Sequence, residues 1–433
     1  MTGIAAEASV VAAPARPWVH YTADRGWMND PHGVVWHEGS YHVFYQCVPD
    51  SVTWSSACLW GHAVSPDLVH WRALPPALTP GPDERGCWSG AAVVTDDGEI
   101  DVFYTRVQED DLGQGTVVRA RPDPDGRRWA SDPGEPIVTA PADLGAHSFR
   151  DPCIFRFEDH WVMVVGAGFR DGRGGLVQFV SPDLETWTYT GVAASRASTE
   201  TEPAWTGAMW ECPQLFEVDG IWVLLVSVWE DDTLYHVAAA TGSYDGRTFV
   251  PARWQQLTFG SSAYAMTSFV DRDGRRCVMS WLREAPDFEP GRAVRAGAHS
   301  LSYLLTVDPS GRVQLSLHPD AELLRDDRLP AARRDEAHVL VADRAVDMEV
   351  RVGPGPVGLV ISVCDRHLLE VPITVSSRVV LDRDIVEICG SDSLAVHRLA
   401  VHRLGVPEAD VTLRVVGAAD VRAWALLSPW ATA

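Results

Sequence analysis

The sequence has no long hydrophobic segment and no excess of positive charge. No apolar run reaches the roughly 18 residues that suggest a membrane helix, so we expect no membrane partner. Lysine and arginine number 36 against 59 aspartate and glutamate residues, which gives a formal net charge of −23. Because binding to nucleic acids needs a basic surface, this charge argues against nucleic-acid partners.

The sequence also lacks the patterns that hold metals, cofactors and disulfides. Its eight cysteines form no C-x-x-C pair, and cysteine and histidine show no metal-like spacing. No phosphate loop, zinc helix or calcium loop is present, so we expect neither a metal nor a cofactor. Residues 1–16 do not fit a secretory signal. We therefore expect a flexible lead-in over 1–16, a cytoplasmic protein, and cysteines that are free, buried thiols.

The chain has 433 residues, which is more than one ordinary single-core domain. Helical periodicity is nearly absent from its sequence. From Trp18 to Leu317, short apolar runs flank polar turns, which is typical of β-hairpins. The hairpins recur about once every 50–60 residues, the size range of propeller blades. Two segments, AVSPDLVHW (63–71) and FVSPDLETW (179–187), repeat a strand, a Ser-Pro-Asp turn and a tryptophan. These features predict a five-bladed β-propeller over residues 17–318.

The residue composition of the sequence changes after Leu317. Residues 319–339 are charged and have little strand character, so we expect a linker that could include a short helix. From residue 340 to 433, apolar and polar residues alternate again, which predicts a second all-β domain of the sandwich type. This region has few aromatic residues and no paired acids, so we expect it to be structural.

Three acidic residues lie directly, or one residue, before a proline in the propeller region. They belong to the triplets 29–31 (Asn-Asp-Pro), 150–152 (Arg-Asp-Pro) and 211–213 (Glu-Cys-Pro). Read singly, each triplet is most simply a turn. Proline, however, restricts the direction of the acid before it, and each triplet precedes a strand-like run. Since the innermost strands of a propeller begin at the channel mouth, three such acids from three blades would converge there.

Convergent carboxylates suit glycoside hydrolysis. One ionised acid attacks or stabilises the oxocarbenium-like centre, and a second protonates the leaving oxygen. Carboxylates about 5–5.5 Å apart retain the configuration, whereas about 6.5–9.5 Å leaves room for an inverting water. The neighbouring Arg150 would keep Asp151 ionised. The 18 tryptophans serve mostly for packing, but a sugar-binding cleft would also recruit several.

Six ordered motifs resemble glycoside hydrolase family 32, the invertase and fructanase family. They are WMNDPHG, YHVFYQ, LWGHAVSPDLVHW, CWSGAAV, FRDP and WECPQLF. The resemblance continues through YDGRTFVP, the Tyr264-Ala265 pair and VMSWL, and it reaches the C-terminal region in VVLDRDIVEICG. The resemblance implies a five-bladed propeller joined to a β-sandwich and retaining hydrolysis of β-fructofuranosides. It makes Asp30 the nucleophile, Glu211 the general acid/base and Asp151 the transition-state stabiliser.

The same resemblance implies a set of residues that bind the fructosyl unit. This set comprises Asn29, Gln46, Trp54, Trp88, Ser89, Arg150 and Trp281. The chain departs from the family pattern at His32, Thr258, Ser262, Ser302 and Tyr303. The segments that contain Thr258, Ser262, Ser302 and Tyr303 border the leaving-group side of the pocket or its support. The residues that bind the fructosyl unit therefore match the family better than those on the leaving-group side. Cys212, beside the acid, is expected to tune the surroundings of Glu211.

Sucrose or a short fructan is thus the expected small carbohydrate substrate, and three alternatives stay open. A sucrose 6-phosphate hydrolase needs a basic cluster at the rim, for which Arg283, Arg292 and Arg295 are the candidates. A fructosyl transferase uses the same acids. A non-catalytic carbohydrate-binding propeller is the third alternative, although all three acids are present. Outside the pocket, we expect structural roles for Asp382 and Glu387.

Overall fold

The computed structural model describes most of the chain after residue 15. The described residues are 16–82, 84–108, 111–126, 128–131, 136–330, 332–334, 337–342, 345–364, 366–399 and 411–430. The lead-in expected over 1–16 lies outside them except for Arg16. Among the described residues the helices are two short 3-10 turns, η1 (Pro290–Arg292) and η2 (Pro319–Leu324). No described helix has the length and apolar composition needed to cross a membrane.

Twenty strands form five antiparallel blades in chain order. Blade I contains β1 (Gly26–His37), β2 (Ser40–Val48), β3 (Leu59–Ser65) and β4 (Arg72–Leu78). Blade II contains β5 (Gly86–Val94), β6 (Ile100–Gln108), β7 (Asp111–Pro122) and β8 (Trp129–Ser131). Blade III contains β9 (Ala146–Phe157), β10 (His160–Phe169), β11 (Arg173–Ser181) and β12 (Thr188–Ala197). Blade IV contains β13 (Met209–Val218), β14 (Ile221–Glu230), β15 (Thr233–Tyr244) and β16 (Phe249–Gln256). Blade V contains β18 (Ala263–Val270), β19 (Arg276–Leu282), β22 (Tyr303–Val307) and β23 (Val313–Leu317).

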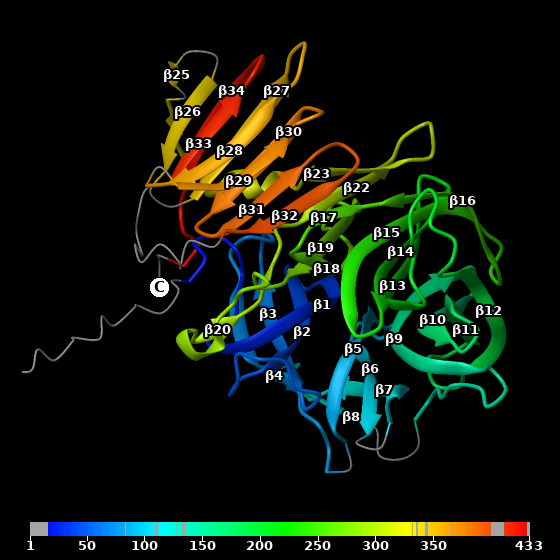
Figure 1. Ribbon diagram of the computed structural model, residues 1–433. Helices are drawn as coiled ribbons and strands as arrows, with labels where there is room; N and C mark the ends of the chain where they lie inside the picture. The colour runs from blue at the N-terminus through cyan, green and yellow to red at the C-terminus, as the bar shows by residue number, and fades with distance from the viewer. Residues whose placement is uncertain are drawn as a thin grey trace, which may run out of the picture.

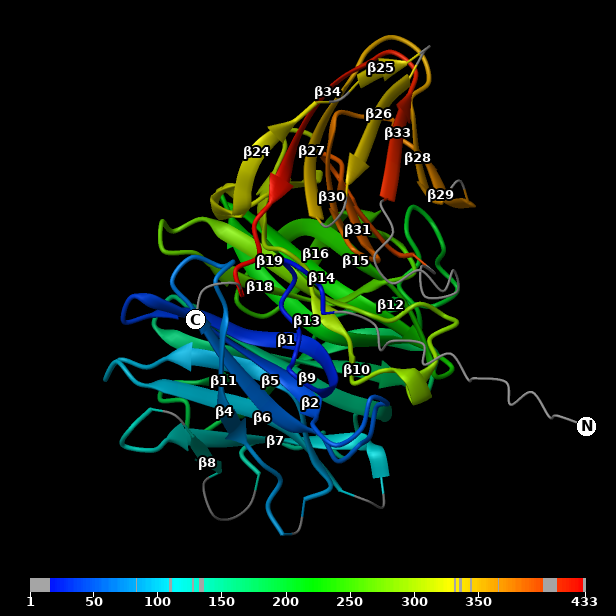
Figure 2. The same ribbon diagram turned by 90° about the vertical axis from the view of Figure 1, so that its left-hand side faces the viewer.

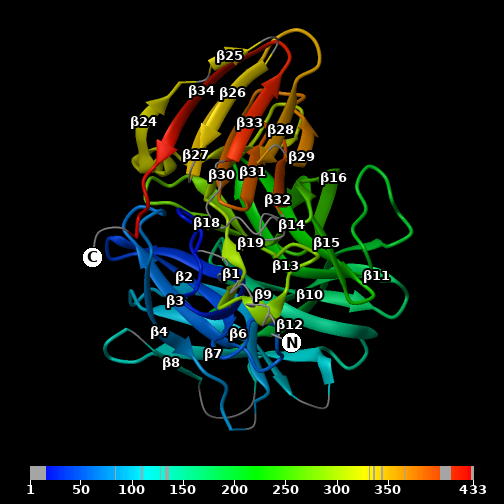
Figure 3. The same cartoon turned by 60° about the vertical axis from the view of Figure 1, so that its left-hand side comes forward.

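The first strand of each blade lines a closed ring. Strand β1 contacts β5, β5 contacts β9, β9 contacts β13, β13 contacts β18, and β18 returns to β1. Two short strands, β20 (Arg295–Ala296) and β21 (Ala298–His299), add to β1 and β19. Figures 1 and 3 show the blue-to-green blades arranged around this centre. The predicted five-bladed propeller is confirmed.

The two repeated segments occupy equivalent turns in different blades. In blade I the Trp71 indole donates to the Leu68 carbonyl, and in blade III the Trp187 indole donates to the Leu184 carbonyl. Both leucines have a positive φ, 63° and 65°. In each case the turn joins the third strand to the fourth, so the repetition that was read from the sequence is a structural one.

Large aromatic residues pack between the blades. Trp60, between blades I and II, and Trp210, between blades III and IV, are fully buried. This accounts for part of the high tryptophan content as packing. All eight cysteines are free, as expected, although Cys364 is exposed and Cys153 and Cys212 are only partly buried.

The remaining strands form a sandwich of two sheets. One sheet has the order β17-β32-β31-β30-β27-β34-β24 and the other the order β25-β26-β33-β28-β29. Their bounds are β17 (Thr258–Gly260), β24 (Arg325–Leu329), β25 (Ala332–Arg334), β26 (Ala337–Ala342), β27 (Ala345–Val352), β28 (Gly358–Val363), β29 (Arg366–Pro372), β30 (Ser377–Asp382), β31 (Ile385–Cys389), β32 (Leu394–Arg398), β33 (Val411–Val416) and β34 (Ala419–Leu426). Figure 2 shows strands β24 to β34, coloured yellow to red, above the propeller. An apolar core of residues from both sheets fills the space between them.

The segment expected to be a linker, 319–339, is only partly one. It contains the short helix η2, but β24 and β25 within it pair with strands of the sandwich. Strand β24 has the sequence RDDRL and lies at a sheet edge with its three central residues exposed. Because both faces of this edge strand are polar or solvent-exposed, it lacks the alternation by which a strand is recognised.

A buried charged group connects the two parts of the chain. His20, which precedes blade I, places Nδ1 2.8 Å from a carboxylate oxygen of Asp382 on β30. Asp382 also accepts hydrogen bonds from the backbone N–H groups of Trp18, Val19 and His20. The Tyr303 hydroxyl, from blade V, donates to Glu387 on β31. The structural role expected for the two acids is therefore to hold the sandwich against the propeller.

Candidate active site

A β-bulge interrupts every one of the five innermost strands near its start. The extra residues lie between Met28 and Pro31 in β1, between Trp88 and Gly90 in β5, at Asp151 in β9, between Glu211 and Gln214 in β13, and between Tyr264 and Thr267 in β18. A bulge re-aims the side chains beside it. Asp151 and Cys212 have positive φ angles of 65° and 44°, which non-glycine residues rarely adopt. The ring of bulges thus directs one group of side chains into the channel mouth.

Asp30 is held by uncharged donors from blades I and II. Its Oδ2 accepts hydrogen bonds from the Ser89 hydroxyl at 2.8 Å and from Gln46 Nε2 at 3.1 Å. Gln46 Nε2 also lies 2.5 Å from Ser89 Oγ, so the three side chains form a closed triangle. Burial raises the pKa of Asp30, and the nearby negative charge of Glu211 raises it further, whereas the Ser89 hydrogen bond lowers it.

Glu211 has contrasting surroundings. Its Oε1 accepts hydrogen bonds from Arg150 Nε at 3.0 Å and from another guanidinium nitrogen of the same residue at 2.8 Å. Its Oε2 accepts from the Tyr264 hydroxyl at 2.6 Å. Both oxygens are therefore held, and the carboxyl group of Glu211 is fixed in direction while 15% of its side chain stays accessible.

Asp151 is the most enclosed of the three acids. Its Oδ2 accepts a hydrogen bond from the Cys212 backbone N–H, and its own N–H donates to Thr105 Oγ1. The pKa of Asp151 is raised, because burial and the charge of Glu211 outweigh the opposing effect of Arg150. Arg150 therefore acts in the expected direction, although its guanidinium hydrogen-bonds to Glu211 and not to Asp151. That Asp151 is ionised stays a prediction.

The thiol of Cys212 joins two of the acids. Its sulfur lies 3.6 Å from an oxygen of Asp30 and 3.7 Å from an oxygen of Asp151. Burial and the surrounding carboxylates raise the pKa of this thiol well above its usual value, so it stays protonated and is a donor, not a nucleophile. It was expected to tune Glu211, but in the structure it contacts the other two acids.

Aromatic side chains surround the carboxylates, and they include the predicted ones. The Trp27 indole donates to Asn29 Oδ1 and packs edge-on against Trp281, with ring centroids 5.5 Å apart. Trp88 is partly buried, and the ring centroid of Trp54 lies 5.7 Å from that of Trp88. Trp54 is 47% exposed and lies at the outer rim. The structure thus brings all ten predicted site residues to one mouth.

Four of the five side chains that depart from the family pattern have a contact that the structure shows, and the Ser302 hydroxyl has no hydrogen-bond partner among the described residues. His32 is buried against the Trp60 ring at 4.1 Å, and burial lowers its pKa to about 3. Thr258 Oγ1 accepts from the Val237 N–H, and the Ser262 hydroxyl donates to the Arg283 carbonyl. Ser302 is buried and Tyr303, as described, reaches the sandwich. None of these five side chains hydrogen-bonds to a carboxyl group of the three acids within the described residues.

Two residues of the site were not among the predicted ones. Tyr264 hydrogen-bonds to Glu211, and Thr105 supports the backbone of Asp151 and donates to the Ser89 carbonyl. Tyr264 begins the bulge of the fifth innermost strand. A search of blade V for a segment equivalent to the three acidic triplets could have found it. Thr105 lies in the second strand of blade II and carries no such signal.

Two of the three candidate phosphate-binding arginines donate to backbone carbonyls. Arg283 donates to the carbonyls of Ser262, Leu234 and Tyr235, and its guanidinium lies 5.2 Å from the Tyr264 ring. Arg295 donates to the Asp24 carbonyl. The side chain of Arg292 lies outside the described residues. A sucrose 6-phosphate hydrolase therefore stays an alternative.

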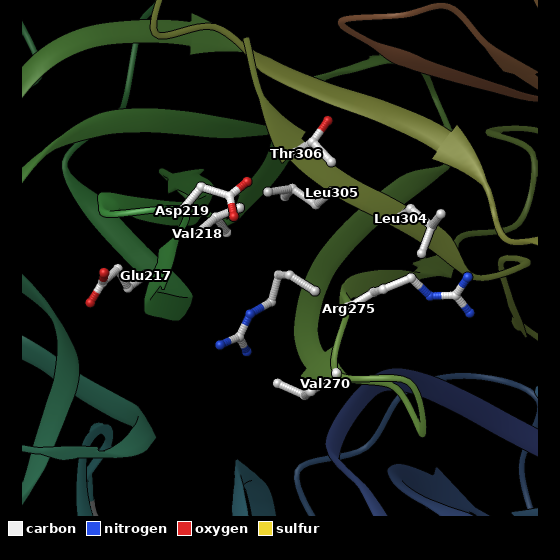
Figure 4. A pocket seen from close by; sticks show the side chains of 10 residues that line it. Glu217, Val218, Asp219, Val270, Arg275, Leu304, Leu305 and Thr306 are labelled. Atoms are coloured by element: carbon white, nitrogen blue, oxygen red, sulfur yellow. The ribbon is translucent and has the colours of Figure 1, made fainter. Parts of the chain in front are cut away.

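Two other features lie away from the acids. Asp271, Cys277 and His318 offer three possible metal ligands within 4.8 Å of one another. Arg275 and His318 already hydrogen-bond to Asp271, however, and His318 Nδ1 accepts from the Asp320 N–H. A pocket between the far ends of blades IV and V is lined by Glu217, Val218, Asp219, Val270, Gly274, Arg275, Arg276, Leu304, Leu305 and Thr306 (Figure 4). None of the three acids lines it.

Comparisons with known proteins agree with this geometry. Residues 20–316 match the model of the family described as glycosyl hydrolases family 32, N-terminal domain. The chain is 32% identical over 354 residues to a cell-wall β-fructofuranosidase of Zea mays, covering 73% of this chain and 58% of that protein. It is 33% identical over 327 residues to a sucrose-6-phosphate hydrolase of Escherichia coli, covering 71% of this chain and 66% of that protein. The chain thus spans less than two thirds of the length of these relatives.

The fold is similar to that of solved structures over nearly the whole chain. A Bombyx mori GH32 β-fructofuranosidase, solved as a D63A mutant in complex with sucrose, superposes with a TM-score of 0.82. The match covers 96% of this chain and 94% of the other, at 24% sequence identity. At this identity the similarity establishes the propeller-plus-sandwich fold.

Proposed function

The chain belongs to glycosyl hydrolases family 32, and from this premise we propose that it is a retaining glycoside hydrolase that removes terminal β-D-fructofuranosyl units. Its substrates are sucrose or short fructans. The observation that supports this most is the contrast between two carboxyl groups at one channel mouth. Asp30 accepts hydrogen bonds from neutral groups, and Glu211 is fixed by Arg150 and Tyr264.

In the first step, Asp30 is the nucleophile. One of its oxygens forms a bond to the anomeric carbon of the fructosyl unit while the bond from that carbon to the leaving oxygen breaks. Glu211 gives its proton to the leaving oxygen, which departs as an alcohol. The uncharged donors around Asp30 suit this role, because its charge is not neutralised by an adjacent cation and stays available for attack.

In the second step, a water molecule displaces Asp30 from the anomeric carbon. Glu211, now a carboxylate, takes a proton from water as the oxygen of that water bonds to the anomeric carbon. The ester bond to Asp30 breaks, and fructose leaves with its original configuration. Two inversions at one carbon account for the retention.

Asp151 binds hydroxyl groups of the fructosyl unit, and its hydrogen bonds strengthen as charge develops on the ring. Asn29, Trp88 and Trp281 shape the pocket around the same unit. The positive φ of Asp151 and its enclosure hold the carboxylate in one direction, which suits a residue that binds tightly only at the transition state.

The alternatives from the sequence remain distinguishable. A fructosyl transferase would use the same two steps, with a sugar hydroxyl in place of water. A carbohydrate-binding propeller without activity would need none of the partners that fix Glu211. A cytoplasmic location also stays a prediction, and the eight free cysteines are consistent with a reducing compartment.

Product analysis tests the proposal. The protein is incubated with sucrose, sucrose 6-phosphate, and oligosaccharides of the inulin and levan types, and the products are identified by chromatography. We expect fructose to be released, and we expect the release to disappear in Asp30→Asn and Glu211→Gln. A wild-type protein that leaves every β-fructoside intact would contradict the proposal, and new oligosaccharides in place of fructose would assign it to the transferases.

A further inference from the structure

The side-chain amide of Gln46 serves Asp30 in one orientation only. Its Nε2 donates to Asp30 Oδ2 at 3.1 Å and lies 2.5 Å from Ser89 Oγ. The Ser89 hydroxyl has one proton and donates it to Asp30, so the atom of Gln46 that faces Ser89 has to be a donor. A reversed amide would turn Oε1 toward the carboxylate and toward a hydroxyl oxygen with no proton left to give. The correct orientation therefore needs a partner on the other side of the amide.

Cys58 is that partner. Gln46 is buried, and a buried carbonyl oxygen needs a donor. The Cys58 sulfur lies 3.0 Å from Gln46 Oε1, and this is the one hydrogen bond to that oxygen in the part of the chain that the structure describes. Burial raises the pKa of the Cys58 thiol well above its usual value, so the thiol keeps its proton and can donate it.

The segment that carries this thiol is fixed to blade II. The Cys87 N–H donates to the Cys58 carbonyl at 2.9 Å, and the Trp88 indole donates to the Ser56 carbonyl at 3.0 Å. A Cβ atom on Gly86 would lie 1.9 Å from the Ser56 carbonyl oxygen, so only glycine allows this close approach. The Cys58 side chain is therefore held in place by the start of β5.

The thiol has one proton and three acceptors near it. Gln46 Oε1 is the nearest, at 3.0 Å, followed by the Cys87 carbonyl at 3.4 Å and the Ser56 carbonyl at 4.0 Å. The Ser56 carbonyl already accepts from the Trp88 indole. Distance thus favours donation to Gln46.

We propose that Cys58 is a positioning residue, whose S–H group donates to Gln46 Oε1 and thereby keeps Gln46 Nε2 directed at the nucleophile Asp30. Cys58 acts through Gln46 and touches neither the substrate nor the reacting atoms. The inference rests on the proposed function, because it concerns the ionised form of Asp30 that attacks the fructosyl unit. Loss of the thiol proton leaves Oε1 without a donor, and Asp30 then loses part of the hydrogen bonding that favours its charge.

Three substitutions separate donation from packing. Cys58→Ala removes the donor and leaves a small gap. Cys58→Val fills the space but has no proton to give, whereas Cys58→Ser is smaller than valine and keeps a donor. Cys389→Ala is the matched control, because this buried thiol donates to the Leu315 carbonyl at 3.5 Å, in the sandwich. Circular dichroism checks that each variant is folded.

The pH profile of kcat/KM on sucrose gives the first readout. We expect the acid limb to move to higher pH by about half a unit to one unit in Cys58→Ala and Cys58→Val. The limbs of Cys58→Ser and Cys389→Ala should coincide with that of the wild type. The other titratable and charged groups near Asp30 are the same in all variants: Arg150, Asp151, Glu211, Cys212 and Tyr264. An acid limb that moves in Cys58→Ser as in Cys58→Ala, or stays in place in both Cys58→Ala and Cys58→Val, would overturn the role of the thiol proton.

Carbon NMR gives the second readout without turnover. In protein labelled at the aspartate carboxyl carbons, the Asp30 signal is the one that is missing from Asp30→Asn, and its titration midpoint should rise in Cys58→Ala and Cys58→Val alone. If the midpoint moves in this way but the wild type hydrolyses no β-fructoside, the proposed function fails and the contact of Cys58 with Gln46 stands. If fructose is released and the midpoint is the same in every variant, the role of Cys58 fails and the proposed function stands.

Discussion

Replacing Ser89 by alanine should move the acid limb of the pH–activity profile to higher pH. The Ser89 hydroxyl donates to Asp30 Oδ2 at 2.8 Å and is the strongest of the interactions that lower the pKa of Asp30. A hydrogen bond to a charged group contributes about 1.5–3 kcal/mol, and 1.36 kcal/mol corresponds to about one pKa unit. Because Gln46 Nε2 remains as a donor to the same oxygen, we expect the lower end of this range, a rise of about one unit.

The sign follows from the role of Asp30 as nucleophile. The ionised form attacks, so activity falls as the pH drops through the pKa of this group. Losing a donor to the ionised form raises the pKa further, and the acid limb of the profile moves to higher pH. The profile of kcat/KM reports the free protein, so a contact between Ser89 and the sugar would alter the height of the curve and leave the position of this limb in place.

The assay is the initial rate of fructose release from sucrose at subsaturating concentration, between about pH 3 and 8, the range in which carboxyl groups with raised pKa values titrate. Ser280→Ala is the control, because Ser280 is also fully buried and its hydroxyl has no hydrogen-bond partner among the described residues. Its acid limb should coincide with that of the wild type. An acid limb of Ser89→Ala that stays in place, or moves to lower pH, would refute the link between this hydroxyl and the nucleophile.

Three further changes have defined outcomes. Tyr264→Phe, which removes the donor to Glu211 Oε2, should lower kcat on sucrose about tenfold or more, and much less on an aryl fructoside whose leaving group needs no proton. Glu211→Gln should show the same contrast between the two substrates, but larger; similar losses on both would argue against proton donation. His20 has a pKa raised to about 9, because Asp382 and Glu387 outweigh the effect of burial. Its contribution to stability is therefore complete below about pH 6.5 and is lost as the pH rises through 9. The melting temperature should fall over this interval in the wild type and fall less in His20→Gln, as followed by circular dichroism.

The positions of the acids could be predicted, but the shape of the mouth could not. Proline after each acid restricts the local backbone, so Asp30, Asp151 and Glu211 stood out from their neighbours. The bulges that aim them depend on which residues of the second strand are paired, a long-range property that no local pattern records. Tyr264 lies in an equivalent bulge but is not followed by a proline.

Long-range contacts also explain features that local patterns missed. Arg283 was a candidate rim cation, and its partners Leu234 and Tyr235 are about 50 residues away in the chain and meet it only because blades IV and V are adjacent. Strand β24 was read as part of a linker because an exposed edge strand needs no apolar face. For Asp151, the adjacent arginine was visible in the sequence, but the burial that raises the pKa of its carboxyl group was not.

The anomer that forms first during hydrolysis distinguishes attack by Asp30 from direct attack by water. Wild-type protein at high concentration is mixed with sucrose, and proton NMR follows the reaction before mutarotation of the released fructose. A covalent fructosyl intermediate on Asp30 predicts that β-fructofuranose appears first, and that neither anomer appears with Asp30→Asn. Initial release of α-fructofuranose would mean a single inversion and would contradict the assignment of Asp30 as the nucleophile.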